Sequence, residues 1–211
     1  MKRLVLLFAL LASTVAFSQK GKAKTKASPT PKNIILTKVD NISAEVITEK
    51  SGKRVVLFVK NDKQVDTLEV KKLDKADFKP VNFTIKSYTT QGKKFYYVNW
   101  KEEVKVDTKL KKENGVVTED QLWDTANKTL LLGNTQKSSQ VKETIFLDAN
   151  KTASHDVEKK RNEGFEFALN ADGSFILKSK TQSSTYAYNA TADRYEIKSS
   201  PKAAAPSKKR R

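Results

Sequence analysis

Between residues 33 and 197 the chain consists of short apolar or alternating runs separated by turn residues. Val81, Phe83 and Ile85 alternate with polar residues, a pattern typical of a strand with one buried face. Val55–Val59 is apolar throughout, which predicts an interior strand. About twelve such runs follow one another at intervals near eleven residues. This spacing predicts an all-β domain, an antiparallel meander that forms either a sandwich or a lipocalin-like barrel.

The clearest predicted hairpin is Phe165–Leu177, in which apolar residues alternate on both sides of an Asp172-Gly173 turn. The segment resembles a hairpin pattern that recurs in small lipoproteins and lipocalin-like envelope proteins. The resemblance covers about thirteen residues. It implies the antiparallel architecture and carries no activity with it.

One segment, 149–164, is predicted to be a short surface helix. Ser154 would cap it, acidic residues would occupy its first turn, and Lys159–Arg161 would occupy its last turn. Gly164 follows directly, as is common after a helix end. Because Val157 is almost its only large apolar residue, such a helix would lie on the surface.

The first eighteen residues have the layout of a secretory signal peptide. Lys2 and Arg3 precede an apolar run of about fourteen residues, shorter than the roughly 20 needed to span a bilayer. Ala16 and Ser18 are the small residues that a signal peptidase requires, so cleavage is predicted before Gln19. The segment resembles signal peptides of Gram-negative bacteria. The sequence therefore predicts an exported, periplasmic or extracellular protein without a transmembrane segment after cleavage.

Residues 19–32 and 198–211 are predicted to be flexible tails flanking a single β-rich domain, 33–197. They are rich in Lys, Ala, Pro and Ser and contain no large apolar residue that could offset the entropy of ordering them. Dispersed cations on such tails attract anionic envelope surfaces or glycans without geometric specificity. The alternative is that the tails only keep the protein soluble. The cations taken as the attracting groups are Lys20, Lys22, Lys24, Lys26, Lys208, Lys209, Arg210 and Arg211.

The formal net charge of +17 invites a nucleic-acid function, but its distribution does not support one. Thirteen of the 41 Lys and Arg residues lie in the predicted signal peptide and the two tails, which contain no Asp or Glu. The other 28 share residues 33–197 with all 24 acids, so this domain carries only about +4. We therefore expect no specific nucleic-acid groove.

The composition also restricts catalytic chemistry. The chain has no Cys and a single His, which excludes thiol catalysis and metal sites built from Cys or from two imidazoles. Residues 148–159 look briefly like a calcium loop, but Ala153 and Lys159 stand where an EF-hand needs Gly and Glu. We expect no cofactor, no metal site and no catalytic residue. A hydrolase using two carboxylates, for example Glu102 and Glu103, is a weaker alternative.

Aromatic residues suggest a second binding function. In Phe95–Trp100, alternate side chains point to opposite faces of a strand, so one aromatic row could line a cavity. The favoured alternative is that one row belongs to the core and the other packs beneath a loop, because strands are rich in aromatic residues in any case. A lipocalin-like carrier would use Tyr96, Trp100, Phe165 and Phe167 to hold a small apolar or aromatic ligand. The leading hypothesis is instead an exported, non-enzymatic binding or structural module of the bacterial envelope.

Overall fold

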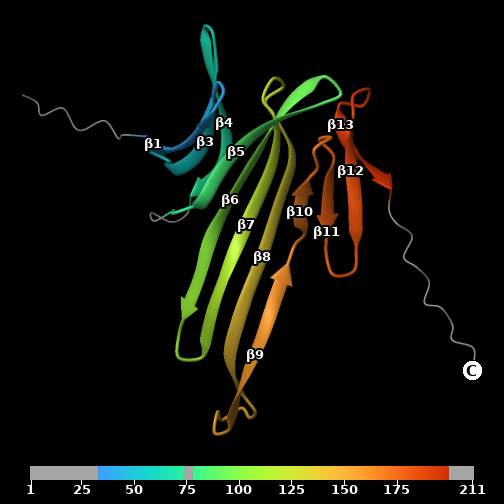
Figure 1. Ribbon diagram of the computed structural model, residues 1–211. Coiled ribbons are helices and arrows are strands. Elements are labelled where there is room, and N and C mark those ends of the chain that lie inside the picture. The colour runs from blue at the N-terminus through green and yellow to red at the C-terminus, as the bar shows by residue number, and fades with distance from the viewer. Residues whose placement is uncertain (1–32, 74–77, 200–211) are drawn as a thin grey trace, which may run out of the picture. The chain divides into compact units, whose positions relative to one another are not determined.

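The computed structural model describes residues 33–73 and 78–199, which form thirteen strands and contain no helix. The strands form three antiparallel sheets in which each strand pairs only with its neighbours along the chain. The predicted all-β meander is confirmed. The lipocalin-like barrel is wrong, because each sheet is open and ends in two edge strands (Figure 1).

The N-terminal sheet contains four strands, and Val55–Val59 lies in its interior strand β3, as predicted. The five-stranded sheet follows it, and the four-stranded C-terminal sheet ends the described chain. The strands are β1 (Ile34–Val39), β2 (Ile42–Glu49), β3 (Gly52–Asn61), β4 (Gln64–Leu73), β5 (Val81–Thr90), β6 (Lys93–Asp107), β7 (Lys111–Asp124), β8 (Thr129–Phe146), β9 (Ser154–Glu163), β10 (Glu166–Leu169), β11 (Phe175–Lys178), β12 (Ser183–Asn189) and β13 (Arg194–Ser199).

The five-stranded sheet contributes to a hydrophobic core on each of its faces. Tyr96, Val98 and Trp100 point to one face, here called the Trp100 face, and pack with buried residues of β2, β3 and β4. Phe95 points to the opposite face, the Phe95 face, where its ring lies 4.8 Å from that of Tyr188 in the C-terminal sheet. Because aromatic residues alternate along β6, this strand packs against the N-terminal sheet on one face and against the C-terminal sheet on the other.

The predicted helix over 149–164 is wrong, since most of this segment is strand β9. β9 pairs with β8 in a register that places Lys159 and Arg161 within reach of Glu143, at 2.5 and 3.3 Å. Both acids and two of the three bases that suggested helix ends instead form ion pairs with Lys142 and Glu143 of β8. These pairs depend on a neighbouring strand, which local sequence does not reveal.

The strands around β7 are longer than the apolar runs predict. β8 is 18 residues long and runs from Thr129 through Gly133 to Phe146. β6 likewise continues seven residues beyond Trp100, through the charged run that follows it. Figure 1 shows the resulting free half of the five-stranded sheet, where β6–β9 extend beyond the strands of the other two sheets.

Candidate functional site

The structure separates the four aromatic residues expected to line a carrier cavity. Tyr96 and Trp100 are buried on the Trp100 face, and the Trp100 ring stacks on Phe83 at 5.3 Å. The half-buried Phe167 lies on the opposite face, stacked on Tyr97 at 5.1 Å. The carbonyl of Phe165 accepts a hydrogen bond from Asn134. Tyr96 and Trp100 therefore pack in one core and Phe167 packs on the opposite face, so these three side chains do not line one cavity.

The tail cations taken as the attracting groups lie in residues 1–32 and 200–211, outside the described residues. The same holds for the predicted signal peptide. Both stay predictions.

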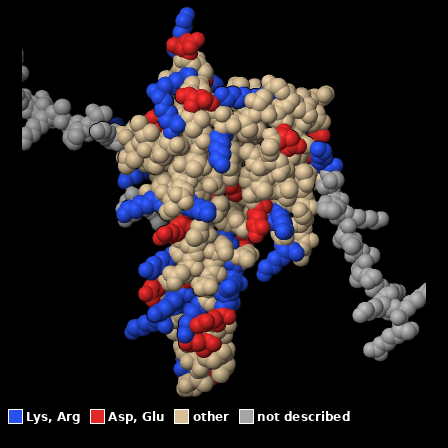
Figure 2. Space-filling model, viewed as in Figure 1, with Lys and Arg blue, Asp and Glu red and all other residues tan. Residues whose placement is uncertain are grey.

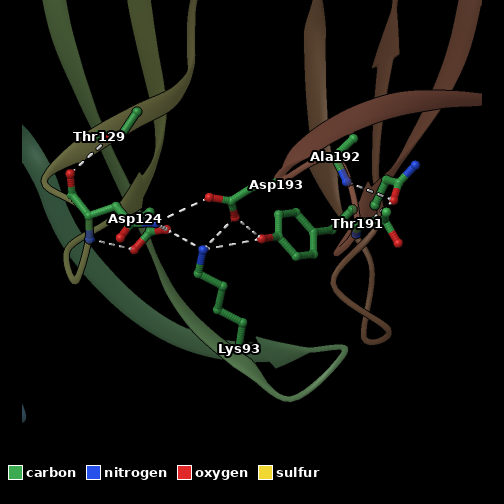
Figure 3. Close-up of polar contacts among 9 residues, drawn as sticks. Lys93, Asp124, Thr129, Thr191, Ala192 and Asp193 are labelled. Carbon is green, nitrogen blue, oxygen red and sulfur yellow. Dashed lines mark hydrogen bonds and ion pairs between the residues drawn. The ribbon is translucent and has the colours of Figure 1, made fainter.

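A network of polar side chains links the five-stranded sheet to the C-terminal sheet, and we call it the Lys93 cluster. It consists of Lys93, Asp124, Asn127, Tyr188 and Asp193. Figure 3 labels Lys93, Asp124 and Asp193. The ammonium of Lys93 lies 2.7 Å from Asp124 and 2.5 Å from Asp193, and donates to the Tyr188 hydroxyl. Asn127 donates to both carboxylates. The cluster thereby joins the β5–β6, β7–β8 and β12–β13 connections.

The charges of the Lys93 cluster satisfy one another. Hydrogen bonds to Asp124 and Asp193 raise the pKa of Lys93, while Lys93 and Tyr188 lower the pKa of Asp193. Burial raises the pKa of the Tyr188 hydroxyl. None of these three groups moves toward neutral pH, where a general acid or base works best. The arrangement favours an ionic clamp between turns over proton transfer.

Glu102 and Glu103, the example of a carboxylate pair for a hydrolase, point to opposite faces of β6. Glu102 accepts from the Trp100 indole at 2.7 Å and pairs with Lys71. The buried Asp120 of β7 accepts from Tyr97, Asn99 and Asn134. The two glutamates therefore do not converge on one cleft.

The segment that resembles a calcium loop closes on itself. The Asp148 carboxylate accepts hydrogen bonds from the Thr152 amide, the Thr152 hydroxyl and the Ala153 amide, and these bonds lower its pKa. His155, the only His, is exposed on β9. Within residues 33–73 and 78–199 no three His, Asp or Glu side chains gather in a way that could hold a metal ion.

The free half of the five-stranded sheet bears an exposed polar surface on its Phe95 face. A hollow of about 430 Å³ lies there, and six of its lining residues form two rows across β7, β8 and β9. One row is Lys112, Lys142 and Glu158; the other is Asn114, Gln140 and Lys160. Figure 2 shows basic and acidic groups interspersed over this lower part of the molecule.

The second row extends onto β6, where Lys105 lies opposite Asn114. We call Lys105, Asn114, Gln140 and Lys160 the Lys105–Lys160 row. All four side chains are exposed, and neither lysine makes an ion pair with any described residue. In the adjoining row, by contrast, Lys142 is held by Asp156 and Glu158 at 3.2 and 3.7 Å. The Lys105–Lys160 row thus leaves two cations and two amides available to a ligand.

On the opposite face of this free half, the Trp100 face, charged side chains pair with one another. Glu113 is buried between Lys111 and Lys137, whose ammonium groups lie 2.8 and 2.6 Å from its carboxylate. Hydrogen bonds from Lys111, Lys137 and Ser139 lower the pKa of Glu113 to about 2. The carboxylates Glu113 and Glu143 on the Trp100 face therefore pair with the lysines and arginine around them, whereas the Phe95 face carries lysines without ion pairs to described residues and is the candidate binding surface.

Sequence reasoning did not select the Lys105–Lys160 row. Its members come from four strands, and each by itself is an ordinary surface residue. The alternation of Val104 and Val106 with polar neighbours was a usable signal that β6 continues beyond Trp100. The register that aligns the four residues depends on hairpin geometry.

Comparisons with known proteins found no match: no family model, no curated protein and no solved structure is significantly similar to this chain. No stretch of the described residues forms a helix that is long and apolar enough to cross a membrane.

Proposed function

We propose that this protein is an exported, non-catalytic binding module of the bacterial envelope, which holds an anionic, chain-like ligand across the Lys105–Lys160 row. The observation that carries the proposal is the alignment of two lysines without ion pairs and two exposed amides across four paired strands. A lysine supplies attraction to carboxylate, sulfate or phosphate groups, and an amide donates and accepts hydrogen bonds.

The spacing of the row favours an extended ligand. Three interstrand distances separate β6 from β9, so the backbones of Lys105 and Lys160 lie about 14 Å apart. Side chains that stand roughly perpendicular to the sheet keep the two ammonium groups well apart, so an extended ligand fits both better than a single small anion does. An acidic oligosaccharide can place one charged group at each lysine and its hydroxyl groups against Asn114 and Gln140.

The electrostatics of the carboxylates support binding without catalysis. Lysine contacts or local hydrogen bonds lower the pKa of Glu113, Glu143 and Asp193, which stay ionised at neutral pH. Such groups are poor proton donors and acceptors near neutrality.

The predicted signal peptide and tails define where the ligand would be met. Export through residues 1–18 would bring the domain to the envelope, where acidic glycans and phosphate groups are accessible. The tail cations would add salt-sensitive attraction over the Debye length, about 10 Å at 0.1 M salt. The row would then supply the contacts that depend on register.

Retention of the full chain on immobilised heparin, used as a model acidic glycan, tests the proposal. The double variant Lys105→Gln/Lys160→Gln should elute at a lower salt concentration than the wild type. The slope of log affinity against log salt should fall by roughly one for each lost contact. Asn114→Ala/Gln140→Ala should also weaken retention, although it changes no charge.

A matched variant separates the row from general charge. Lys38→Gln/Lys63→Gln removes two other exposed lysines and changes the net charge equally. The proposal requires a clearly smaller effect from this pair. Equal effects of the two double variants, together with no effect of the amide variant, would show that heparin senses only net charge and would reject the row as a site.

A further inference from the structure

Three exposed aliphatic side chains lie at the free end of the five-stranded sheet. Leu110 in the β6–β7 turn is 47% exposed, Ile145 near the end of β8 is 41% exposed, and Leu147 in the β8–β9 connection is 66% exposed. We call these three residues the apolar tip. Figure 1 shows the two connections at the same end of β6–β9. A soluble surface gains nothing from exposing large aliphatic groups together, so their position suggests a contact.

Hydrogen bonds fix both connections that carry the apolar tip. Thr108 and Lys111 bond to each other across the β6–β7 turn, with the Thr108 amide 2.9 Å from the Lys111 carbonyl. The Thr144 amide donates to the Leu110 carbonyl at 2.8 Å, which places Leu110 beside the end of β8. Asp148 closes the β8–β9 connection through Thr152 and Ala153. The tip is therefore presented on braced turns.

Near the apolar tip the acidic side chains have local partners, whereas two lysines form no ion pair with any described residue. Local partners hold the carboxylates: Asp148 caps its own loop, and Asp156 bonds to Thr144 and Lys142. Lys109, exposed beside Leu110, makes no ion pair within the described residues. Lys151 likewise makes no ion pair there, and its ammonium lies 5.6 Å from the Phe146 ring centre. Two lysines that form no ion pair within the described residues thus flank the exposed aliphatic groups.

We propose that the apolar tip docks the protein on an anionic phospholipid bilayer. Leu110, Ile145 and Leu147 enter the boundary between headgroups and acyl chains, while Lys109 and Lys151 contact lipid phosphates. Aliphatic groups beside lysines are the combination that binds peripherally to anionic membranes, because burial and headgroup attraction act together. This partner differs from the ligand of the Lys105–Lys160 row and does not depend on it.

The size of the apolar tip favours lipid over a protein partner. A stable protein interface buries about 800 Å² on each side and contains a packed centre. Three aliphatic side chains on two turns form no such centre and no groove. A fluid bilayer requires no complementary shape, so a few aliphatic groups inserted by about 5–10 Å suffice.

Cosedimentation of the full chain with vesicles tests the docking. The vesicles contain phosphatidylcholine and phosphatidylglycerol, and vesicles of phosphatidylcholine alone serve as the reference. Leu110→Ser/Leu147→Ser should lower the partition coefficient for anionic vesicles by roughly tenfold or more. Lys109→Gln/Lys151→Gln should lower it by roughly fivefold per lysine and reduce the preference for anionic lipid.

The chain provides a matched control at the other end of the same sheet. Leu130, next to the β7–β8 turn, is 43% exposed, close to the value for Leu110. Leu130→Ser should leave vesicle binding unchanged. Because every variant keeps residues 1–32 and 200–211, any contribution of these segments to vesicle binding is the same in all.

A fluorescence measurement reports insertion directly. Tryptophan introduced by Leu147→Trp should shift its emission to shorter wavelength when anionic vesicles are added, whereas Leu130→Trp should show no shift. The native Trp100 and Trp123 are buried and give the same background in both variants.

The outcomes separate membrane docking from self-association and from the proposed glycan function. Equal vesicle binding by the Leu110→Ser/Leu147→Ser and Leu130→Ser variants, or absence of an emission shift for Leu147→Trp, overturns the docking. A change in oligomeric state with unchanged vesicle binding also overturns it, in favour of self-association. Lys105→Gln/Lys160→Gln should weaken heparin retention and leave the emission shift intact, so either proposal can fail alone.

Discussion

Gly164 lies where the chain leaves the five-stranded sheet and enters the C-terminal sheet. Its φ is +81°, in the left-handed region, and a Cβ added to it would lie 2.1 Å from the Thr135 carbonyl oxygen. Both conditions require a residue without a side chain. The position of β10 beside the Phe95 face therefore depends on this residue type.

The left-handed conformation alone costs a residue with a side chain about 1–2 kcal/mol. Gly164→Ala is expected to destabilise the protein by more than this, because β8 and β9 must also move apart to make room for the added methyl group. Gly92→Ala is the matched control, since Gly92 has a φ of +76° but no atom within 4 Å of an added Cβ. Urea unfolding followed by tryptophan fluorescence measures both. Equal losses for the two variants would contradict the close approach to Thr135.

The lowered pKa of Glu113 predicts how the free energy of unfolding changes with pH. Its pKa in the folded protein, about 2, lies below the usual value of a glutamate. A lowered pKa stabilises the folded state above the unfolded pKa, and this contribution disappears as the pH falls toward the folded value. The difference in unfolding free energy between the wild type and Glu113→Gln should therefore be largest above about pH 5 and shrink toward pH 2.

Urea unfolding at a series of pH values measures this difference. Glu163→Gln, an exposed glutamate on β9, serves as the reference for a change at the surface of the same sheet. A difference for Glu113→Gln that stays constant between pH 7 and pH 2 would show that the ionised form of Glu113 is not what Lys111 and Lys137 stabilise.

At the scale of elements, the Lys93 cluster couples three turns that belong to two sheets. Lys93→Met keeps much of the side-chain volume but leaves the Asp124 carboxylate, which is 2% exposed, without its cation. We expect the protein to lose about 2 kcal/mol of unfolding free energy. Amide hydrogen exchange should become faster in the β5–β6, β7–β8 and β12–β13 connections.

Lys94→Met is the control for this element. Lys94 pairs with Asp40, and both side chains are at least two-fifths exposed. Surface pairs of this kind contribute about 0–1 kcal/mol. A loss for Lys94→Met as large as that for Lys93→Met would contradict the clamp.

The same scale explains what local sequence could predict. The C-terminal hairpins were predictable because their signals are local: Asp172-Gly173 forms the turn, and Tyr186 and Tyr188 pair with Ile197 and Tyr195 as alternation requires. β9 was not predictable in this way. Its acid-then-base order also fits a helix dipole, and only the partners on β8, Lys142 and Glu143, show that these charges serve strand pairing.

The candidate site was less predictable than the fold. Alternation predicts which face of a strand a residue occupies, but the Lys105–Lys160 row exists only when four strands adopt one register. Tyr96, Trp100 and Phe167, which were expected to line a carrier cavity, do not come together, and the reason is related. Adjacent aromatic residues of β6 belong to different cores, because two sheets cover opposite faces of that strand.

At the scale of the whole molecule, the predicted export would determine which surfaces the protein can meet. If residues 1–18 are a signal peptide, the exported chain should begin at Gln19, and this residue should be partly cyclised to pyroglutamate. Mass spectrometry of protein recovered outside the cytoplasm checks the mass and the first residue. Ala16→Phe removes a small residue that the peptidase requires and should block the cut. Protein that keeps residues 1–18 after export would contradict this prediction.

Every strand in the described chain pairs with the strand before or after it, so the strands can pair in the order in which they are synthesised. A chain delivered N-terminus first can complete the hydrogen bonds of β1–β4 before the five-stranded sheet has emerged. The apolar face of the N-terminal sheet, with Val55 and Leu57, then stays exposed to water until Tyr96 and Trp100 of β6 pack against it. During this interval the exposed apolar face is the surface that a chaperone would bind. A chain truncated before β6 would keep this face exposed and would be prone to aggregate.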